Sequence, residues 1–181
     1  MHRIAKLLAG AAMVAALAAS APALAGSYDI VVAPVEIDTG DFKREGIGFN
    51  GTSPGPVLRF TEGETVTLNV TNKLAETTSI HWHGLILPFR QDGVPTISFD
   101  GIKPGETFTY TFPTRQTGTY WYHSHSGMQE PDGAFGSIVI TPKAGERVPS
   151  DRDYVVMLSD PHPHTPHRIP RNLNTMPDYY N

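Results

Sequence analysis

Thr65-Val66-Thr67-Leu68-Asn69-Val70 is the stretch that decides the fold, because polar and apolar side chains alternate along it one by one. Successive side chains of a β-strand point to opposite faces of the sheet, so this pattern predicts a strand with one buried face. Thr107-Phe108-Thr109-Tyr110-Thr111-Phe112 repeats the alternation. Both segments are therefore predicted to be half-buried strands.

Short apolar or aromatic runs, bounded by turn-forming residues, lie on either side of these two strands. The runs are Ile30–Val32, Val35–Ile37, Arg44–Asn50, Val57–Phe60, Ser79–Leu85, Thr117–His125 and Ser137–Ile140. Turns are predicted at Asn50–Gly55 and at Glu62-Gly63, and the chain contains 17 glycines and 16 prolines. No helix is predicted beyond the N-terminal segment. Many short strands at regular intervals predict an all-β fold, a Greek-key β-sandwich or barrel.

The chain of 181 residues is predicted to contain one complete domain, residues 26–145, and a remainder, residues 146–181. Pro142–Glu146 has the composition of a linker. Beyond it, Asp153–Ser159 is predicted to be a strand that has no partner strand nearby in the sequence. A lone apolar strand needs a sheet to join. The favoured interpretation is that residues 146–181 are a linker and the truncated start of a second domain. The alternative is that the strand extends the sheet edge of the first domain.

Residues 1–25 have the features of a secretory signal peptide. Arg3 and Lys6 precede the apolar stretch Leu7–Ala19, and Ala23-Leu24-Ala25 fits the cleavage rule, so the mature chain is predicted to start at Gly26. A membrane anchor is the alternative, but the apolar stretch is shorter than the roughly 18–20 residues that a span needs. Without an Arg-Arg pair, the general secretion route is favoured over the twin-arginine route.

Charge and cysteine content exclude several classes of function. The net charge is −4, and it becomes about −6 once Arg3 and Lys6 leave with the signal peptide. No basic patch indicates nucleic acid or anionic lipid as a partner. The chain contains no cysteine. Disulfides, thiol nucleophiles and thiolate metal sites are therefore excluded.

Two His-x-His pairs, His81-Trp82-His83 and His123-Ser124-His125, are the candidate metal ligands. Residues i and i+2 of a strand share a face, so each pair is predicted to point its two imidazoles in one direction. Trp121 is predicted to lie on the histidine face, with Trp82, Tyr120 and Tyr122 opposite. A single histidine on a strand is usually an ordinary polar residue, but two such pairs in one domain favour a metal site. Imidazole ligands suit copper or zinc.

The histidine pairs belong to a longer series of motifs. Phe49–Pro56 precedes them, Asp92-Gly93-Val94-Pro95 lies between them, and Gly118–Gly127 contains the second pair. Together with His81–Gly84 and the tail Met176–Asn181, these motifs resemble those of multicopper oxidases. The amino-acid sequences of these motifs are most similar to those of the bacterial CopA-type copper-resistance oxidases. The resemblance covers most of the first domain.

The resemblance implies a cupredoxin-like first domain that supplies four of the eight ligands of a trinuclear copper cluster. By motif position, His81 would bind the type 2 copper, and His83, His123 and His125 the type 3 pair. Asp92 matches an acidic residue that helps to deliver protons while dioxygen is reduced to water. The alternative for Asp92 is an ordinary turn residue. The resemblance also implies a periplasmic location and a second cupredoxin domain after residue 145.

The sequence departs from the family in one decisive respect. The family's type 1 copper and its other four cluster ligands come from a C-terminal domain with a His-Cys-His motif, and this chain has no cysteine. The chain is therefore expected to bind copper without turning over by itself, while the parent protein would couple oxidation of Cu(I) or a phenol to reduction of dioxygen. Two alternatives remain. One is a standalone periplasmic copper-buffering protein, and the other is a subunit completed by a separate cysteine-containing chain.

A second histidine-rich stretch, Asp160–His167, contains His162, His164 and His167 among prolines. One interpretation is an auxiliary copper-capture site. The favoured interpretation is a solvated linker that the prolines keep extended, because no scaffold for a site is visible in the sequence.

Overall fold

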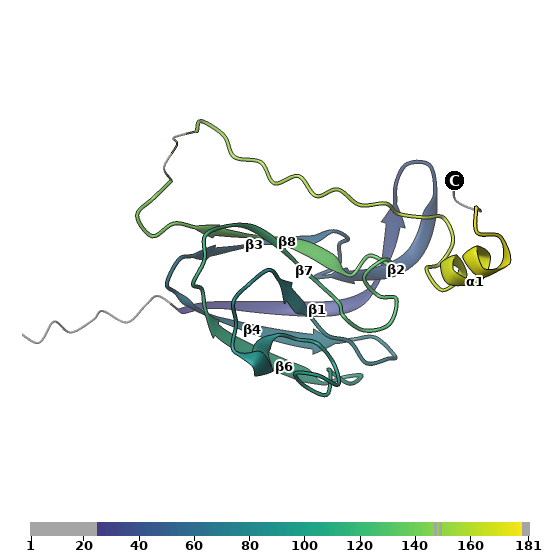
Figure 1. Ribbon diagram of the computed structural model, residues 1–181, viewed down its shortest axis with the longest axis horizontal. Helices are drawn as coiled ribbons and strands as arrows, with labels where there is room; N and C mark the ends of the chain where they lie inside the picture. The colour runs from purple at the N-terminus through teal and green to yellow at the C-terminus, as the bar shows by residue number, and fades with distance from the viewer. Residues whose placement is uncertain (1–24, 147, 149, 179–181) are drawn as a thin grey trace, which may run out of the picture.

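The structure, a computed structural model, describes residues 25–146, 148 and 150–178. Residues 1–24 of the predicted signal peptide lie outside the described residues. Two four-stranded sheets pack face to face (Figure 1). None of the helices in the described part of the chain has the length and apolar character needed to cross a membrane.

The first sheet has the strand order β2-β1-β4-β6. Its strands are β1 (Ala25–Asp38), β2 (Lys43–Phe49), β4 (Thr65–Asn72) and β6 (Thr107–Pro113). The alternation predicted for β4 is confirmed, since Val66, Leu68 and Val70 are fully buried. Strand β1 is one strand of 14 residues rather than the two predicted. It pairs with β4 up to Val32 and with β2 from Val32 onward, so it continues past Pro34 by changing partners.

The second sheet has the order β3-β8-β7-β5. Its strands are β3 (Gly55–Thr61), β5 (His81–His83), β7 (Gly118–His123) and β8 (Phe135–Thr141). Strands β5 and β7 are shorter than the predicted segments 79–85 and 117–125. His125 therefore lies beyond the end of β7.

An aromatic core fills the space between the sheets. Trp82 and Tyr122 are fully buried, and the Trp82 ring meets Tyr110 edge to face with centroids 5.2 Å apart. Phe49 packs against Tyr122 at 5.1 Å. Because Trp82 and Tyr122 point inward, the residues next to them in β5 and β7 point to the outer face of the second sheet. The predicted all-β sandwich is confirmed.

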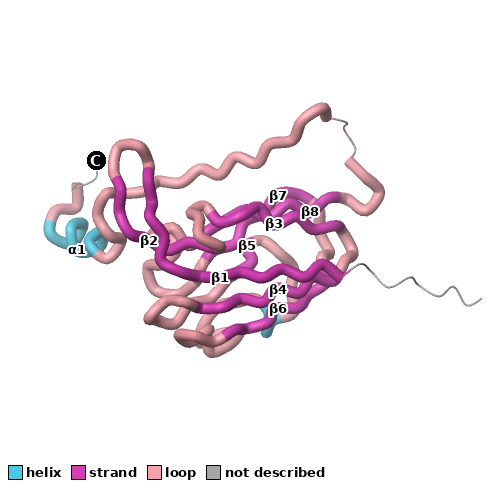
Figure 2. The backbone as a smooth tube through the Cα atoms, turned by 180° about the vertical axis from the view of Figure 1, so that it is seen from behind, coloured by secondary structure: helices cyan, strands magenta, loops and turns pink. Residues whose placement is uncertain are grey.

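The tail differs from the sequence-based expectation. The strand predicted at Asp153–Ser159 is wrong, because this segment pairs with neither sheet (Figure 2). It passes outside the second sheet and is separated from it by a cavity of about 710 Å³, so its amides do not reach a strand edge. Residues 155–158 line the cavity, which is open to solvent, since Leu158 in its lining is 88% exposed. The proposed start of a second domain in this tail stays a prediction.

The expectation of no helix was also wrong. A short 3-10 helix, η1, spans Phe89–Gln91, and the tail ends in helix α1, Arg168–Thr175. Pro170 lies in the first turn of α1, where a proline is tolerated because the amide has no partner within the helix. Asn172 and Asn174 are poor helix formers, which hid this helix from the sequence pattern.

Candidate metal centre

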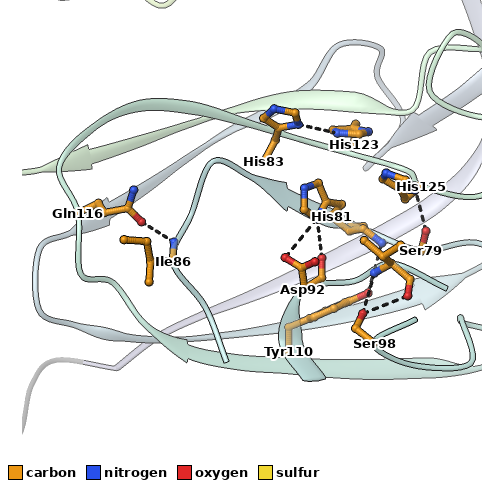
Figure 3. Close-up of polar contacts among 12 residues, drawn as sticks. Ser79, His81, His83, Ile86, Asp92, Ser98, Tyr110, Gln116, His123 and His125 are labelled. Atoms are coloured by element: carbon orange, nitrogen blue, oxygen red, sulfur yellow. Dashed lines mark hydrogen bonds and ion pairs between the residues drawn. The ribbon is translucent and has the colours of Figure 1, made fainter. Parts of the chain in front are cut away.

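Pairing of β5 with β7 brings the two histidine pairs together. The strands are antiparallel, and their register sets His81 opposite His123 and His83 opposite Trp121. His81, His83 and His123 lie on the outer face of the second sheet, with Trp121 on the same face and Trp82 and Tyr122 in the core. His125 follows β7 and lies beside them. Figure 3 shows the imidazoles converging from β5 and from the end of β7.

The four imidazole rings form one group. The ring centroids of His81 lie 5.5 Å from His83, 5.4 Å from His123 and 5.5 Å from His125. Ring nitrogens of His81, His83 and His123 all lie within 4.8 Å of one another. The fourth ring, that of His125, lies 5.8 Å from His123 by centroids. We refer to these four residues as the histidine group.

Hydrogen bonds select which nitrogen of each buried ring faces the group. His81 Nδ1 donates to the backbone carbonyl of Asp92 at 2.7 Å. His123 Nδ1 lies 2.8 Å from a carboxylate oxygen of Glu130 and 3.0 Å from the carbonyl of Ser124. A neutral imidazole has one N–H and one lone pair, so both rings keep Nε2 as the ligand atom. His123 Nε2 therefore accepts a hydrogen bond from His83 Nδ1 at 3.2 Å, so the ligand nitrogen of His123 points at the ring of His83.

Glu130 is a functional residue that the sequence analysis missed. Its carboxylate accepts the Nδ1 hydrogen of His123, and such a contact fixes the orientation of a metal ligand and raises its basicity. It lies seven residues after His123 in the loop beyond β7, where strand alternation no longer applies. The only signal was an acidic side chain close behind the second histidine pair.

The loop after β7 is positioned by a buried glutamine. The side-chain oxygen of Gln129 accepts hydrogen bonds from the hydroxyls of Thr78 and Ser124, both at 2.7 Å. The Gln129 amide donates to Glu76 at 2.8 Å. On the same loop, the backbone N–H of His125 donates to Ser79 Oγ at 3.0 Å. These bonds tie the segment before β5 to the loop after β7 and place His125 in the histidine group although it lies outside a strand.

Electrostatics keep the most buried imidazole neutral. Burial lowers the pKa of His123 to about 4, and the neighbouring rings of His81, His83 and His125 act in the same direction. A metal ligand must be unprotonated, so His123 is ready to bind a metal at neutral pH.

Asp92 sits beside His81 but outside the ring of imidazoles. Its carboxylate oxygen lies 3.5 Å from His81 Nδ1, and its side chain is 38% exposed. The next residue, Gly93, lets the loop that carries Asp92 lie against the backbone of Ile80 and His81. Any Cβ at this position would lie 1.7 Å from the carbonyl oxygen of Ile80. The exposed carboxylate thus connects solvent to the edge of the histidine group.

Comparisons with known proteins place this arrangement in a family. The family model of multicopper oxidases matches residues 31–145. Copper resistance protein A of Escherichia coli is 49% identical over 154 residues, which are 85% of this chain and 26% of that protein. A copper resistance protein A homolog of Pseudomonas syringae pv. tomato has the same identity and coverage. The crystal structure of a multi-copper oxidase from Pseudomonas thermotolerans superposes with a TM-score of 0.64 at 36% identity, covering 71% of this chain and 31% of that one.

The chain belongs to the multicopper oxidase family. It spans about a quarter of the length of the copper resistance proteins that it matches. The donor set fits the family's metal, because the converging ligand atoms are imidazole nitrogens, which suit copper. Copper is therefore the cofactor, and a chain without cysteine has no ligand set for a type 1 site.

Proposed function

We propose that this chain is the copper-binding N-terminal domain of a periplasmic copper-resistance multicopper oxidase. The domain supplies half of the ligands of the trinuclear copper cluster. His81 binds the type 2 copper, and His83, His123 and His125 bind the type 3 pair. The observation that carries the proposal is the convergence of the four imidazoles on one sheet face, with three of their nitrogens within 4.8 Å of one another.

Copper bound here would accept electrons and reduce dioxygen, as multicopper oxidases do. The protein's own part is to fix the imidazoles before metal arrives. Asp92 and Glu130 hold His81 and His123 through their Nδ1 atoms, which keeps both Nε2 lone pairs on the metal side. A half-exposed carboxylate next to His81 can also take protons from solvent, so we assign proton delivery to Asp92.

As a lone chain the domain is proposed to bind copper without turning over. It lacks the type 1 cysteine through which electrons would enter, and it has only half of the cluster's ligands. The parent protein would oxidise Cu(I) or a phenol and pass the electrons to dioxygen. The missing cupredoxin domains would follow in the same polypeptide. Export by the predicted signal peptide would place the protein in the periplasm.

A subunit completed by a separate chain is the second candidate. Tyr154, Val156 and Leu158 are 74%, 78% and 88% exposed, so the tail presents a stripe of uncovered apolar side chains. Such a stripe favours a further protein surface that covers it. This observation fits missing domains in the same polypeptide and in a partner chain, and it disfavours a standalone copper-buffering protein.

An oxygen-uptake assay tests the proposal. The purified chain is loaded with copper and given a phenol or Cu(I), and dioxygen consumption is followed. We expect bound copper and no catalytic uptake. Adding a separately produced cysteine-containing domain should restore uptake if assembly occurs between chains. Catalytic turnover by the lone chain would contradict the proposed division of the cluster, and a chain that binds no copper would contradict the proposal as a whole.

A further inference from the structure

Two histidines of the tail lie together in a second, separate place. The ring centroids of His162 and His164 are 5.1 Å apart, with an angle of 50° between the ring planes. This distance is shorter than the His81–His123 distance of 5.4 Å. With metal–nitrogen bonds of about 2.0 Å, two imidazoles on one ion place their ring centres roughly 4.5–5.5 Å apart. The rings are thus spaced as two ligands of a single ion.

A buried arginine holds this segment in place. Arg44 Nε donates to the carbonyl of His162 at 2.8 Å, and Arg44 Nη1 pairs with Asp132 at 2.5 Å. The Arg44 side chain is only 7% exposed, so the anchor belongs to the folded domain. Asp132 balances the charge of Arg44, which removes the main repulsion that a nearby cation would meet. The sequence analysis favoured an unscaffolded linker, and this anchor supplies the scaffold that was not visible there.

Prolines restrict the backbone around the two rings. Pro161, Pro163 and Pro166 alternate with the histidine-bearing positions, and Pro166 is buried. Fixed proline φ angles reduce the entropy that a metal would have to remove on binding. The backbone N–H of His164 donates to His162 Nδ1 at 3.0 Å, so Nδ1 is the ring nitrogen of His162 that carries the lone pair. A metal bound at His162 Nδ1 would take the place of the His164 N–H on this lone pair.

We propose that His162 and His164 bind one Cu(II) ion in a site separate from the histidine group. Two imidazoles completed by water form a tetragonal nitrogen and oxygen set, which suits Cu(II). One segment links the two sites, since Glu130 contacts His123 and Asp132 holds Arg44 two residues later. The site thus holds copper beside the histidine group. It does not depend on the proposed oxidase function.

The test counts copper by equilibrium dialysis against a weak Cu(II) buffer and records the electron paramagnetic resonance spectrum of the bound ion. The background is the full chain with His81→Ala and His123→Ala, so that the histidine group is disabled. We expect one bound Cu(II) with nitrogen hyperfine structure. Adding His162→Ala and His164→Ala should remove this equivalent. His167→Ala is the matched control and should retain it, because within the described residues the ring contact of this segment joins only His162 and His164.

Equal copper binding with and without the His162→Ala and His164→Ala substitutions would overturn the proposal. So would an equal loss in the His167→Ala control. If the background variant fails to fold by circular dichroism, the same comparison is made with the histidine group intact, where one equivalent of the total should disappear. Failure of the histidine group itself is seen separately, as no difference between the unmodified chain and the His81→Ala/His123→Ala chain.

Discussion

His81 and His123 lie directly opposite each other in the antiparallel pair β5–β7, with their ring centroids 5.4 Å apart. A one-residue slip of this register would move every side chain of β5 to the other face of the sheet. The buried Trp82 and Tyr122, which also lie opposite each other, prevent such a slip from the core side. Core packing therefore positions the metal ligands on the outer face.

Glu130 is predicted to position His123 for metal binding. Glu130→Ala removes the charged acceptor of the Nδ1 hydrogen and leaves only the Ser124 carbonyl, and loss of such a contact lowers metal affinity by roughly 10–100-fold. Competition with a copper chelator measures the affinity. Glu130→Gln keeps an acceptor oxygen at the same position and should recover most of the affinity. Equal affinity in Glu130→Ala and the unmodified chain would show that the contact is incidental.

Gly93 is predicted to be indispensable to the loop that carries Asp92. Gly93→Ala would force a Cβ against the Ile80 carbonyl and should lower the free energy of unfolding by about 3–5 kcal/mol. Gly105→Ala is the matched control, because the φ of Gly105 is +78° against +76° for Gly93 but its Cβ would meet no atom within 4 Å. It should cost only about 1–2 kcal/mol, the cost of left-handed backbone. Denaturant titration distinguishes the two, and similar losses would contradict the steric argument.

The stability of the copper-free chain is predicted to fall as the pH drops from about 6.5 to about 4. Folding lowers the pKa of His123 from 6.5 to about 4, so in this window the unfolded chain binds a proton that the folded chain does not. Protons therefore favour unfolding, by about 3 kcal/mol once the pH is below both values. Thermal unfolding in the presence of a metal chelator, repeated at several pH values, measures the slope of stability against pH. His123→Gln should flatten it and His167→Gln should not; an unchanged slope in His123→Gln would assign it to other groups.

Trp121 is predicted to report copper binding. Its ring stacks on His123 with centroids 4.1 Å apart and 19° between the planes, whereas Trp82 lies in the core on the other face of the sheet. Bound Cu(II) quenches nearby tryptophan emission. Trp121→Phe should remove most of the copper-dependent quenching, and Trp82→Phe should preserve it. The reverse pattern in a fluorescence titration would place copper elsewhere.

Strand periodicity predicted the sandwich and the shared face of His81 and His83, because both follow from alternation along a strand. It could not predict why His125 joins them, since that residue lies beyond β7 and is held by Ser79 from a distant segment. Glu130 was missed for the same reason. The Asp153–Ser159 strand failed because an apolar pattern says nothing about whether a partner strand lies within hydrogen-bonding distance.

Copper binding by the His81→Ala/His123→Ala variant is the most direct test of the central claim. Both proteins are compared in the His162→Ala/His164→Ala background, so that the tail histidines do not contribute, and bound copper is measured by equilibrium dialysis at neutral pH. We expect stoichiometric copper in the chain with an intact histidine group and none in the variant. Equal copper in the two would contradict it, because the ligands would then lie outside the face that β5 and β7 build.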